Sequence, residues 1–219
     1  MKRIGLLGGS FNPAHRGHRR LSLHAIRKLG LDEVWWLVSP GNPLKDKAGM
    51  APFKARMASA QRMALHAPIR VTDIEKRLRT RYTADTLDRL SRAFPKHRFI
   101  WLMGADNLAQ FDKWERWRDI ARQVPIAVIA RPGYDARAHA SPAMSWLRRA
   151  VRPAGQAKKW TSWRLPALVL LRFRPDPTSA TRIRAADPAW HRRFPNARSI
   201  SISAPSVPSP PSRTDMLQP

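Results

Sequence analysis

The sequence predicts an α/β protein with a doubly wound, mostly parallel sheet and helices on both faces. Short apolar runs alternate with longer segments of helical periodicity along most of the chain. Runs such as EVWWLVS at 33–39 are apolar on both faces, as strands covered by helices are. Glycines follow the first and fourth apolar runs, where the ligand loops of such sheets lie.

The first elements form a strand–helix–strand unit. RIGLLG at 3–8 is an apolar run that leads into a glycine-rich loop, so we expect a strand. Apolar residues recur at helical spacing through 17–30, and Gly30 provides a stop for that helix. The run at 33–39 is the second strand.

The middle of the chain continues the alternation. The segment 40–49 carries two prolines and two glycines and predicts a loop. A helix follows at 52–66, with proline at its first position. We then expect a short strand at 69–75 and a helix at 82–94 that Thr83 caps.

The last third closes the same pattern. A strand at 97–106 runs into a glycine turn, and a short helix follows at 114–123. Strands are expected at 125–131 and 166–173, and a final helix at 178–186. Because ligands bind at the carboxyl ends of parallel strands, the segments after each strand are the informative ones.

We expect one domain over residues 1–195. Within it, 134–164 shows only weak helical character, around 142–151. From residue 196 to 219 the composition shifts to six serines and five prolines in 24 residues. This composition predicts a disordered tail without a role in activity.

Charge is the most unusual global property. The chain has 41 lysines and arginines against 15 acidic residues, a formal charge of +26. The cations are scattered through nearly every segment, and no helix-turn-helix, zinc-finger or RNP-type pattern accompanies them. An anionic small substrate therefore explains the charge better than a nucleic acid does, although a basic nucleic-acid-binding protein stays as the alternative from a different class.

Composition also excludes several kinds of chemistry. The chain has no cysteine, which rules out disulfides, thiolate metal sites and a cysteine nucleophile. The apolar runs are too short to cross a bilayer, and the amino-terminal run is broken by glycine and proline. We therefore expect a cytoplasmic protein without a membrane partner; a homo-oligomer is compatible with the sequence.

The segment GLLGGSFNPAHRGH at 5–18 has the character of an anion site. Glycines after a strand let backbone N–H groups approach an anion, and the following helix directs its positive end there. His15 and His18 lie at that helix start, where imidazoles can donate to phosphate oxygens. A metal reading lacks a third ligand, so we expect no protein-bound metal at this pair.

Other segments fall at the same edge of the sheet. GADN at 104–107 places a glycine and a carboxylate after a strand, and Trp114 can stack on a heteroaromatic ring. TSATRIR at 178–184 places hydroxyls at a helix start with an arginine one turn on, as a polyphosphate tail requires. With no evident nucleophile, this set predicts phosphoryl or nucleotidyl transfer by positioning.

With these residues the sequence resembles the Rossmann-like nucleotidyltransferases marked by a His/Thr-x-Gly-His motif. Within them it is similar to bacterial nicotinate-nucleotide adenylyltransferases. The resemblance covers residues 3 to about 186 and is carried by five segments in the family's order. They are GGSFNPAHRGH (8–18), SPGNPLK (39–45), YTADTL (82–87), MGADNLAQFDKW (103–114) and TSATRIR (178–184). The segment at 103–114 separates this subfamily from pantetheine-phosphate and cytidylyl relatives.

The resemblance implies adenylyl transfer from ATP to nicotinate mononucleotide, which gives deamido-NAD and pyrophosphate in NAD biosynthesis, assisted by Mg²⁺. It implies catalytic roles at the α-phosphate and the polyphosphate tail for His15, His18 and Arg184. It places ATP against Gly8, Gly9, Ser10, Phe11, Gly104, Asp106, Ser179 and Thr181. It places the mononucleotide against Lys45, Thr83, Ala84, Trp114, Glu115 and Arg131, with Trp114 on the nicotinate ring.

Three features depart from the family pattern. Asn12 stands where relatives often have aspartate, which leaves open whether this position helps a metal or only shapes the turn. Ala180 replaces a serine that is common there and removes one hydroxyl from the phosphate helix. The tail at 196–219 has no expected counterpart. The residues leave a second substrate open as well, namely nicotinamide mononucleotide, the amide.

Overall fold

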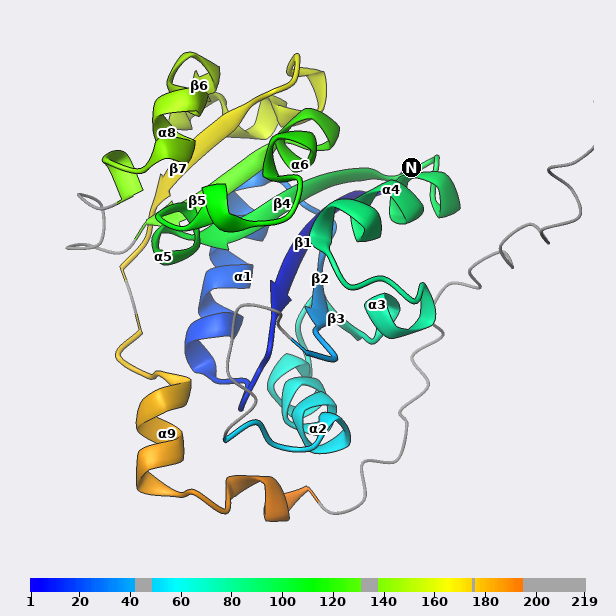
Figure 1. The fold of residues 1–219 in the computed structure, drawn as a ribbon, viewed down its shortest axis with the longest axis vertical. Coiled ribbons are helices and arrows are strands. Elements are labelled where there is room, and N and C mark those ends of the chain that lie inside the picture. The colour runs from blue at the N-terminus through cyan, green and yellow to red at the C-terminus, as the bar shows by residue number, and fades with distance from the viewer. Residues whose placement is uncertain (42–48, 131–137, 175, 195–219) are drawn as a thin grey trace, which may run out of the picture.

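The computed structural model describes residues 1–41, 49–130, 138–174 and 176–194. They form a seven-stranded sheet in the order β3-β2-β1-β4-β5-β7-β6, with helices on both faces (Figure 1). All the described neighbouring strands pair in parallel. The expected doubly wound α/β fold is confirmed, and the described sheet is parallel throughout.

The elements alternate as the apolar pattern predicted. The strands are β1 (Arg3–Gly9), β2 (Glu33–Val38), β3 (Ile69–Thr72), β4 (Arg98–Gly104), β5 (Ile126–Ala130), β6 (Val151–Arg152) and β7 (Leu168–Arg172). The helices are α1 (Arg16–Leu29), α2 (Phe53–Ala64), α3 (Ile74–Arg77), α4 (Thr83–Ala93), α5 (Ala105–Leu108), α6 (Trp117–Gln123), α8 (Pro142–Leu147) and α9 (Ala180–Ala186). Short 3₁₀ segments are η1 (Phe111–Lys113), η2 (Arg148–Ala150), η3 (Ala154–Ser162) and η4 (Trp190–Arg193).

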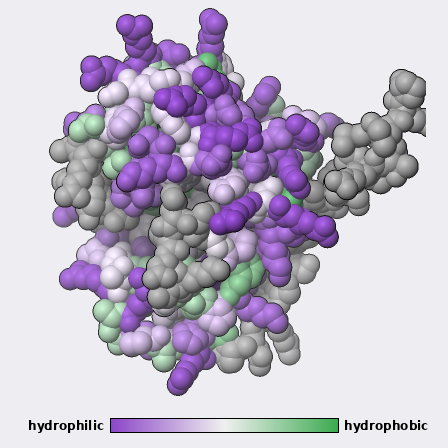
Figure 2. All heavy atoms as spheres, viewed as in Figure 1, coloured by the Kyte–Doolittle hydropathy of each residue, from purple (hydrophilic) through white to green (hydrophobic). Residues whose placement is uncertain are grey.

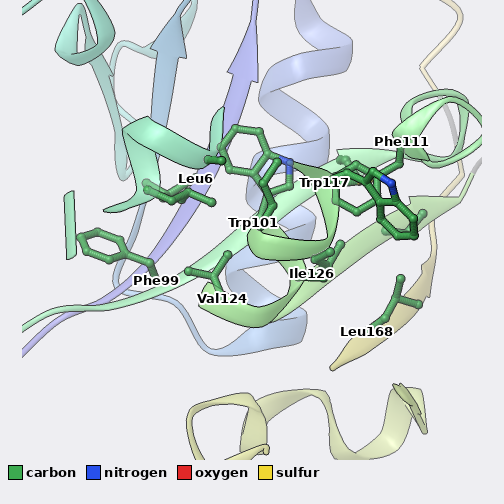
Figure 3. Packing of buried hydrophobic residues seen from close by; sticks show 14 of the residues in the cluster. Leu6, Phe99, Trp101, Phe111, Trp117, Val124, Ile126 and Leu168 are labelled. Carbon is green, nitrogen blue, oxygen red and sulfur yellow. The ribbon is translucent and has the colours of Figure 1, made fainter. Parts of the chain in front are cut away.

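The sheet separates two hydrophobic cores, because successive strand residues point to opposite faces. In β2, Trp35 belongs to the core under α4, α6 and α8, whereas Trp36 belongs to the core under α1, α2 and η3. Figure 3 shows the first of these cores, where Leu6, Trp101 and Ile126 of the sheet share a cluster with Trp117 of α6. Both faces are therefore buried, as the continuous apolar runs required.

Several element boundaries differ from the sequence prediction. The helix expected at 52–66 spans Phe53–Ala64, so Pro52 lies at the cap position and is not the first helical residue. The strand expected at 69–75 ends at Thr72, and Ile74–Arg77 forms α3 instead. Thr83 does not cap α4 but is its first residue, after Tyr82 at the cap position. The helix expected at 114–123 begins only at Trp117, because Arg116 has a left-handed φ of 52° that interrupts helical continuation.

The weakly patterned segment 134–164 adds one strand that the sequence analysis missed. β6 has only two residues and pairs with β7 at the sheet edge. The 3₁₀ segment η3 then packs against α1, where Trp160 donates through Nε1 to the Leu29 carbonyl at 3.0 Å. A two-residue strand carries no detectable periodicity, which is why the pattern did not predict it.

The strand order reverses between β1 and β4. From β1 the chain builds outward to β2 and β3 on one side, then returns to β4 and continues to the other edge. In sheets of this kind the crevice at the carboxyl ends of the two central strands binds the ligand. Here those ends are Gly9 of β1 and Gly104 of β4.

The surface agrees with the scattered charge of the sequence. Figure 2 shows hydrophilic side chains spread over the visible face, with hydrophobic ones in smaller separate areas. Among the described residues, no helix is both long enough and apolar enough to cross a bilayer.

Candidate active site

The turn after β1 exposes backbone and excludes side chains. A Cβ at Gly8 would lie 2.8 Å from the Trp101 ring, so only glycine fits there. Phe11 has a left-handed φ of 48°, and its buried ring stacks on Trp36 at 4.9 Å with an interplanar angle of 20°. The side chain of Phe11 is therefore used in packing, and its contribution to a ligand site is its backbone.

His15 and His18 cap α1 reciprocally. The Gly17 N–H donates to His15 Nδ1 at 3.1 Å, and the His15 N–H donates to His18 Nδ1 at 3.2 Å. A ring nitrogen that accepts a hydrogen bond carries no proton, so in both neutral rings the proton lies on Nε2. The ring centroids are 3.9 Å apart. The capping arrangement therefore supplies two neighbouring Nε2–H donors at the positive end of a helix.

Gly17 has a steric reason to be glycine. A Cβ there would lie 2.9 Å from both Nδ1 and Cε1 of the His15 ring. It would also lie 3.3 Å from the Thr178 carbonyl oxygen, which belongs to the segment before α9. The glycine of His15-x-Gly17-His18 thus lets the imidazole and the α9 segment approach the helix start together.

The α9 segment is docked on this turn. Arg184 donates through Nη1 to the Asn12 carbonyl at 2.6 Å. Arg20 of α1 forms an ion pair with Asp176 at 3.0 Å, and the pKa of Asp176 is lowered far below its usual range by Thr178, first through its hydroxyl and then through its N–H, and by Arg20. Two sequence-distant parts of the predicted phosphate site, one near residue 15 and one near residue 180, are therefore in contact.

The hydroxyl groups at the start of α9 have separate positions. Ser179 is the N-cap, and its Oγ accepts from the Arg182 N–H at 3.2 Å. Thr181 is exposed and lies beside Arg184, whose Nη2 is 3.4 Å from its Oγ1. Ala180, the departure noted in the sequence, is the first residue of the helix.

A cavity of about 350 Å³ opens beside the glycine turn, a volume in the range of small-ligand sites. It lies between the carboxyl ends of β1 and β2, the start of α4 and the loop before α6. Its lining residues are Gly8, Gly9, Ser10, Ser39, Glu75, Arg81, Tyr82, Thr83, Trp101, Asn107, Gln110, Lys113, Trp114 and Glu115. The predicted residues Thr83, Trp114 and Glu115 thus share one cavity with the glycine turn.

Trp114 is held on edge at the wall of this cavity. Its half-buried ring meets Trp101 at a centroid distance of 6.1 Å and Phe111 at 5.4 Å, both nearly perpendicular. The adjacent Arg116 pairs with Asp85 of α4 at 2.9 Å, which fixes the loop to that helix. Trp114 can therefore present an ordered ring face to a flat ligand.

The remaining predicted residues are placed differently. Gly104 lies at the carboxyl end of β4, next to the carboxyl end of β1 where the glycine turn begins. Asp106 is exposed in the first turn of α5. Ala84 is fully buried in the core, so only its backbone can face a ligand. Lys45 and Arg131 lie outside the described residues, as does the tail at 196–219.

Comparison with known proteins bears directly on this arrangement. The cytidylyltransferase-like family model matches residues 6–186. A probable nicotinate-nucleotide adenylyltransferase from Erythrobacter litoralis is 62% identical over 192 residues, 88% of each chain. One from Parvibaculum lavamentivorans is 54% identical over 182 residues, 83% of this chain and 90% of that protein. The chain belongs to the nicotinate-nucleotide adenylyltransferase family.

The fold of this family is also found among solved structures. The Plasmodium falciparum nicotinic acid mononucleotide adenylyltransferase complexed with NaAD superimposes with a TM-score of 0.60 at 17% identity, over 84% of this chain and 83% of that chain. The same protein complexed with APC gives a TM-score of 0.58. The expected nucleotidyltransferase fold is therefore confirmed, and the relatives at 62% and 54% identity confirm the expected enzyme family.

Asn12, the departure from the adenylyltransferase pattern, has a structural use. Its Nδ2 donates to the Gly49 carbonyl at 2.9 Å, and its Oδ1 accepts from the Ala51 N–H at 3.2 Å. Aspartate could accept the second bond but could not donate the first. The amide therefore shapes the turn by tying it to the segment before α2.

Two buried ionisable residues near the candidate site were not predicted from the sequence. Glu75 of α3 lines the cavity, and burial raises its pKa to about 7. A hydrogen bond with the Ser39 side chain acts in the opposite direction and lowers this pKa. Arg56 of α2 is 1% exposed, and its burial lowers its pKa. Each lies inside a segment that reads as an ordinary amphipathic element, so only the tertiary structure reveals its position.

Among the residues that the structure describes, no group of three or more histidine and acidic side chains is suited to a metal ion.

Proposed function

We propose that this protein transfers the adenylyl group of ATP to nicotinate mononucleotide and releases pyrophosphate. The observation that carries the proposal is the reciprocal capping of His15 and His18, which provides two Nε2–H donors next to a glycine turn and a cavity with an aromatic wall. Family membership supports the same reaction.

In this reaction a phosphate oxygen of the mononucleotide attacks the α-phosphorus of ATP. The new P–O bond forms the diphosphate bridge of deamido-NAD. The bond between the α-phosphorus and the oxygen that bridges the α- and β-phosphates breaks, and pyrophosphate leaves with that oxygen. Negative charge increases on the α-phosphate oxygens during the transfer, and the donors on His15 and His18 stabilise it there. The chain has no cysteine, and the proposal requires no covalent intermediate.

ATP would lie across the β1 and α9 side of the crevice. We assign the backbone of Gly8 to Phe11 to the nucleotide and Gly104 with Asp106 to the adenosine part. The β- and γ-phosphates would meet Ser179, Thr181 and Arg184, and Arg184 already lies against the turn through Asn12. Mg²⁺ is proposed as a companion of ATP, where it neutralises phosphate charge and is held mainly by the phosphates.

The mononucleotide would occupy the cavity. Its nicotinate ring would stack on Trp114. Its carboxylate would meet backbone N–H groups, those around Glu115 and those at the start of α4 around Thr83 and Ala84. Lys45 and Arg131, outside the described residues, are proposed to contact its phosphate. The helix start favours an anionic ring substituent, which is the reason for preferring the acid over the amide.

The decisive experiment is pyrophosphate release from ATP with each mononucleotide. We expect kcat/KM for nicotinate mononucleotide to exceed that for nicotinamide mononucleotide. A preference for the amide would overturn the substrate assignment while keeping the reaction. Absence of turnover together with salt-dependent nucleic-acid binding would instead favour a nucleic-acid-binding protein.

Replacing Trp114 by alanine is expected to raise KM for the mononucleotide about tenfold, because one aromatic stacking contact is lost. KM for ATP should change little. The matched control is Trp117→Phe, since Trp117 packs in the core against Trp146 and lies outside the cavity lining. Steady-state kinetics with each substrate varied in turn provide the measurement; an unchanged KM for the mononucleotide would return Trp114 to a packing role.

A further inference from the structure

Arg56 is a buried cation that is surrounded by backbone carbonyls. It lies on α2 with 1% of its surface exposed. Its Nη1 donates to the carbonyl oxygens of Ser10 at 2.7 Å and Ser39 at 2.8 Å. Its Nε donates to Ala51 at 3.1 Å and its Nη2 to Pro40 at 3.3 Å.

This arginine forms no ion pair with any acidic residue that the structure describes. Burial of a charged group without a counter-ion is costly, and the carbonyl dipoles are what stabilise it here. The guanidinium also lies 5.3 Å from the centre of the Phe53 ring. A buried helix face could be filled by an apolar residue at lower cost, so the contacts to the loops require a separate explanation.

Three of the four carbonyls come from two loops at the site, and the fourth, that of Ala51, lies just before α2. Ser10 belongs to the glycine turn after β1, and Ser39 with Pro40 follows β2. Ser10 and Ser39 both line the mononucleotide cavity. One side chain therefore joins the turn assigned to ATP with the loop on the mononucleotide side.

These bonds also orient peptide groups. In a trans peptide the N–H points opposite to the C=O, so fixing the Ser10 carbonyl turns the Phe11 N–H away from Arg56. The same holds for the Pro40 carbonyl and the Gly41 N–H. Neither the Ser10 N–H nor the Phe11 N–H has a hydrogen-bond partner among the described residues, which leaves the turn with two donors for an anion.

We propose that Arg56 is a positioning residue that holds the two substrate loops in their binding geometry. It touches neither substrate and acts through the Ser10 and Ser39–Pro40 backbone. The proposal rests on the adenylyl transfer proposed above, because that reaction brings ATP to the Ser10 turn and the mononucleotide to the cavity that Ser10 and Ser39 line.

The test compares Arg56→Met and Arg56→Lys with wild type at a temperature where each is fully folded by circular dichroism. Methionine is expected to lower kcat/KM for both substrates about 100-fold, the scale of a 1 Å misplacement. Lysine keeps the charge with fewer directed donors and is expected to recover part of the loss. Hydrogen exchange should quicken at the Ser39 and Ala51 amides in Arg56→Met, because Arg56 holds both residues by their carbonyls and their N–H groups donate to the Gly9 carbonyl at 3.0 Å and to Asn12 Oδ1 at 3.2 Å.

The matched control is Leu29→Ala, which weakens the core shared with α2 at the far end of α1. We expect it to lower thermal stability with kcat/KM unchanged. A folded Arg56→Met with wild-type kcat/KM, or equal losses in Arg56→Met and Leu29→Ala, would overturn the positioning role. The exchange measurement needs no substrate, so it tests Arg56 even if wild type fails to use nicotinate mononucleotide. Unchanged exchange at the Ser39 and Ala51 amides would also overturn the positioning role.

Discussion

Replacing His18 by alanine is expected to lower kcat by about 10²–10³-fold, the effect of removing one donor that stabilises transition-state charge. The hydrogen bond from the His15 N–H to His18 Nδ1 keeps the proton on Nε2, so the ring is prepared as a donor before substrate binds. The same substitution also removes half of the cap of α1, which costs about 1 kcal/mol and leaves the fold intact.

A second histidine of the same helix serves as the control. His24 packs on Phe173 at 5.1 Å, and His24→Ala is expected to leave kcat unchanged. Steady-state kinetics at saturating ATP and mononucleotide, with thermal unfolding of each variant, separate chemistry from stability. If His18→Ala keeps kcat within threefold of wild type, His18 is not a donor in the transition state.

The fold could be predicted because most of the buried strands are continuous runs of apolar residues. A run such as that of β2 must be covered on both faces, and the spacing of such runs leaves room only for crossover helices. Once the strands are assigned, their carboxyl ends are known, and Gly9 and Gly104 lie at two of these ends. The two-residue strand β6 escaped prediction because its position is fixed by pairing with β7 and by packing, not by its own sequence.

Residues of the candidate site could be grouped from the sequence only where they lie close together along the chain. The residues of His15-x-Gly17-His18 lie next to each other and cap their own helix, so their spacing is informative. Arg56 and Glu75 become informative only through partners elsewhere in the chain, at Ser10 and Ser39 among others. In a single sequence, a lone arginine on a helix is indistinguishable from a solvated one.

Asn12 illustrates the difference between a residue's type and its use. Its position in the turn left a metal-related role open in the sequence. The structure shows both ends of its amide engaged with backbone, at Gly49 and Ala51. The distinction required two partners about 40 residues away, which no local pattern could supply.

Replacing Glu75 by glutamine is expected to stabilise the protein above pH 7 by about 3 kcal/mol and to have little effect near pH 4.5. Burial raises the folded-state pKa of Glu75 to about 7, from an ordinary value of 4.5. Between these values the unfolded chain has released the proton and the folded protein retains it. Wild-type stability therefore falls as pH rises through this window, and the loss is complete above pH 7.

Denaturant unfolding of Glu75→Gln and wild type at pH 5 and pH 8 measures this difference directly. The control is Glu115→Gln, because Glu115 is an exposed carboxylate in the lining of the same cavity. The free energies of unfolding of Glu115→Gln and wild type should agree within about 0.5 kcal/mol at both pH values. An equal pH dependence of Glu75→Gln and wild type would show that Glu75 ionises without cost in the folded protein.

The same titration should appear in substrate binding, because Glu75 lines the cavity assigned to an anionic mononucleotide. Above pH 7 the ionised carboxylate repels the substrate phosphate and carboxylate, so wild-type KM for the mononucleotide should rise with pH. In Glu75→Gln this rise should be absent, while KM for ATP, on the α9 side of the crevice, changes less. A KM that rises equally in both proteins would place the responsible group on the substrate or elsewhere in the chain. The cavity charge would then be set by residues other than Glu75.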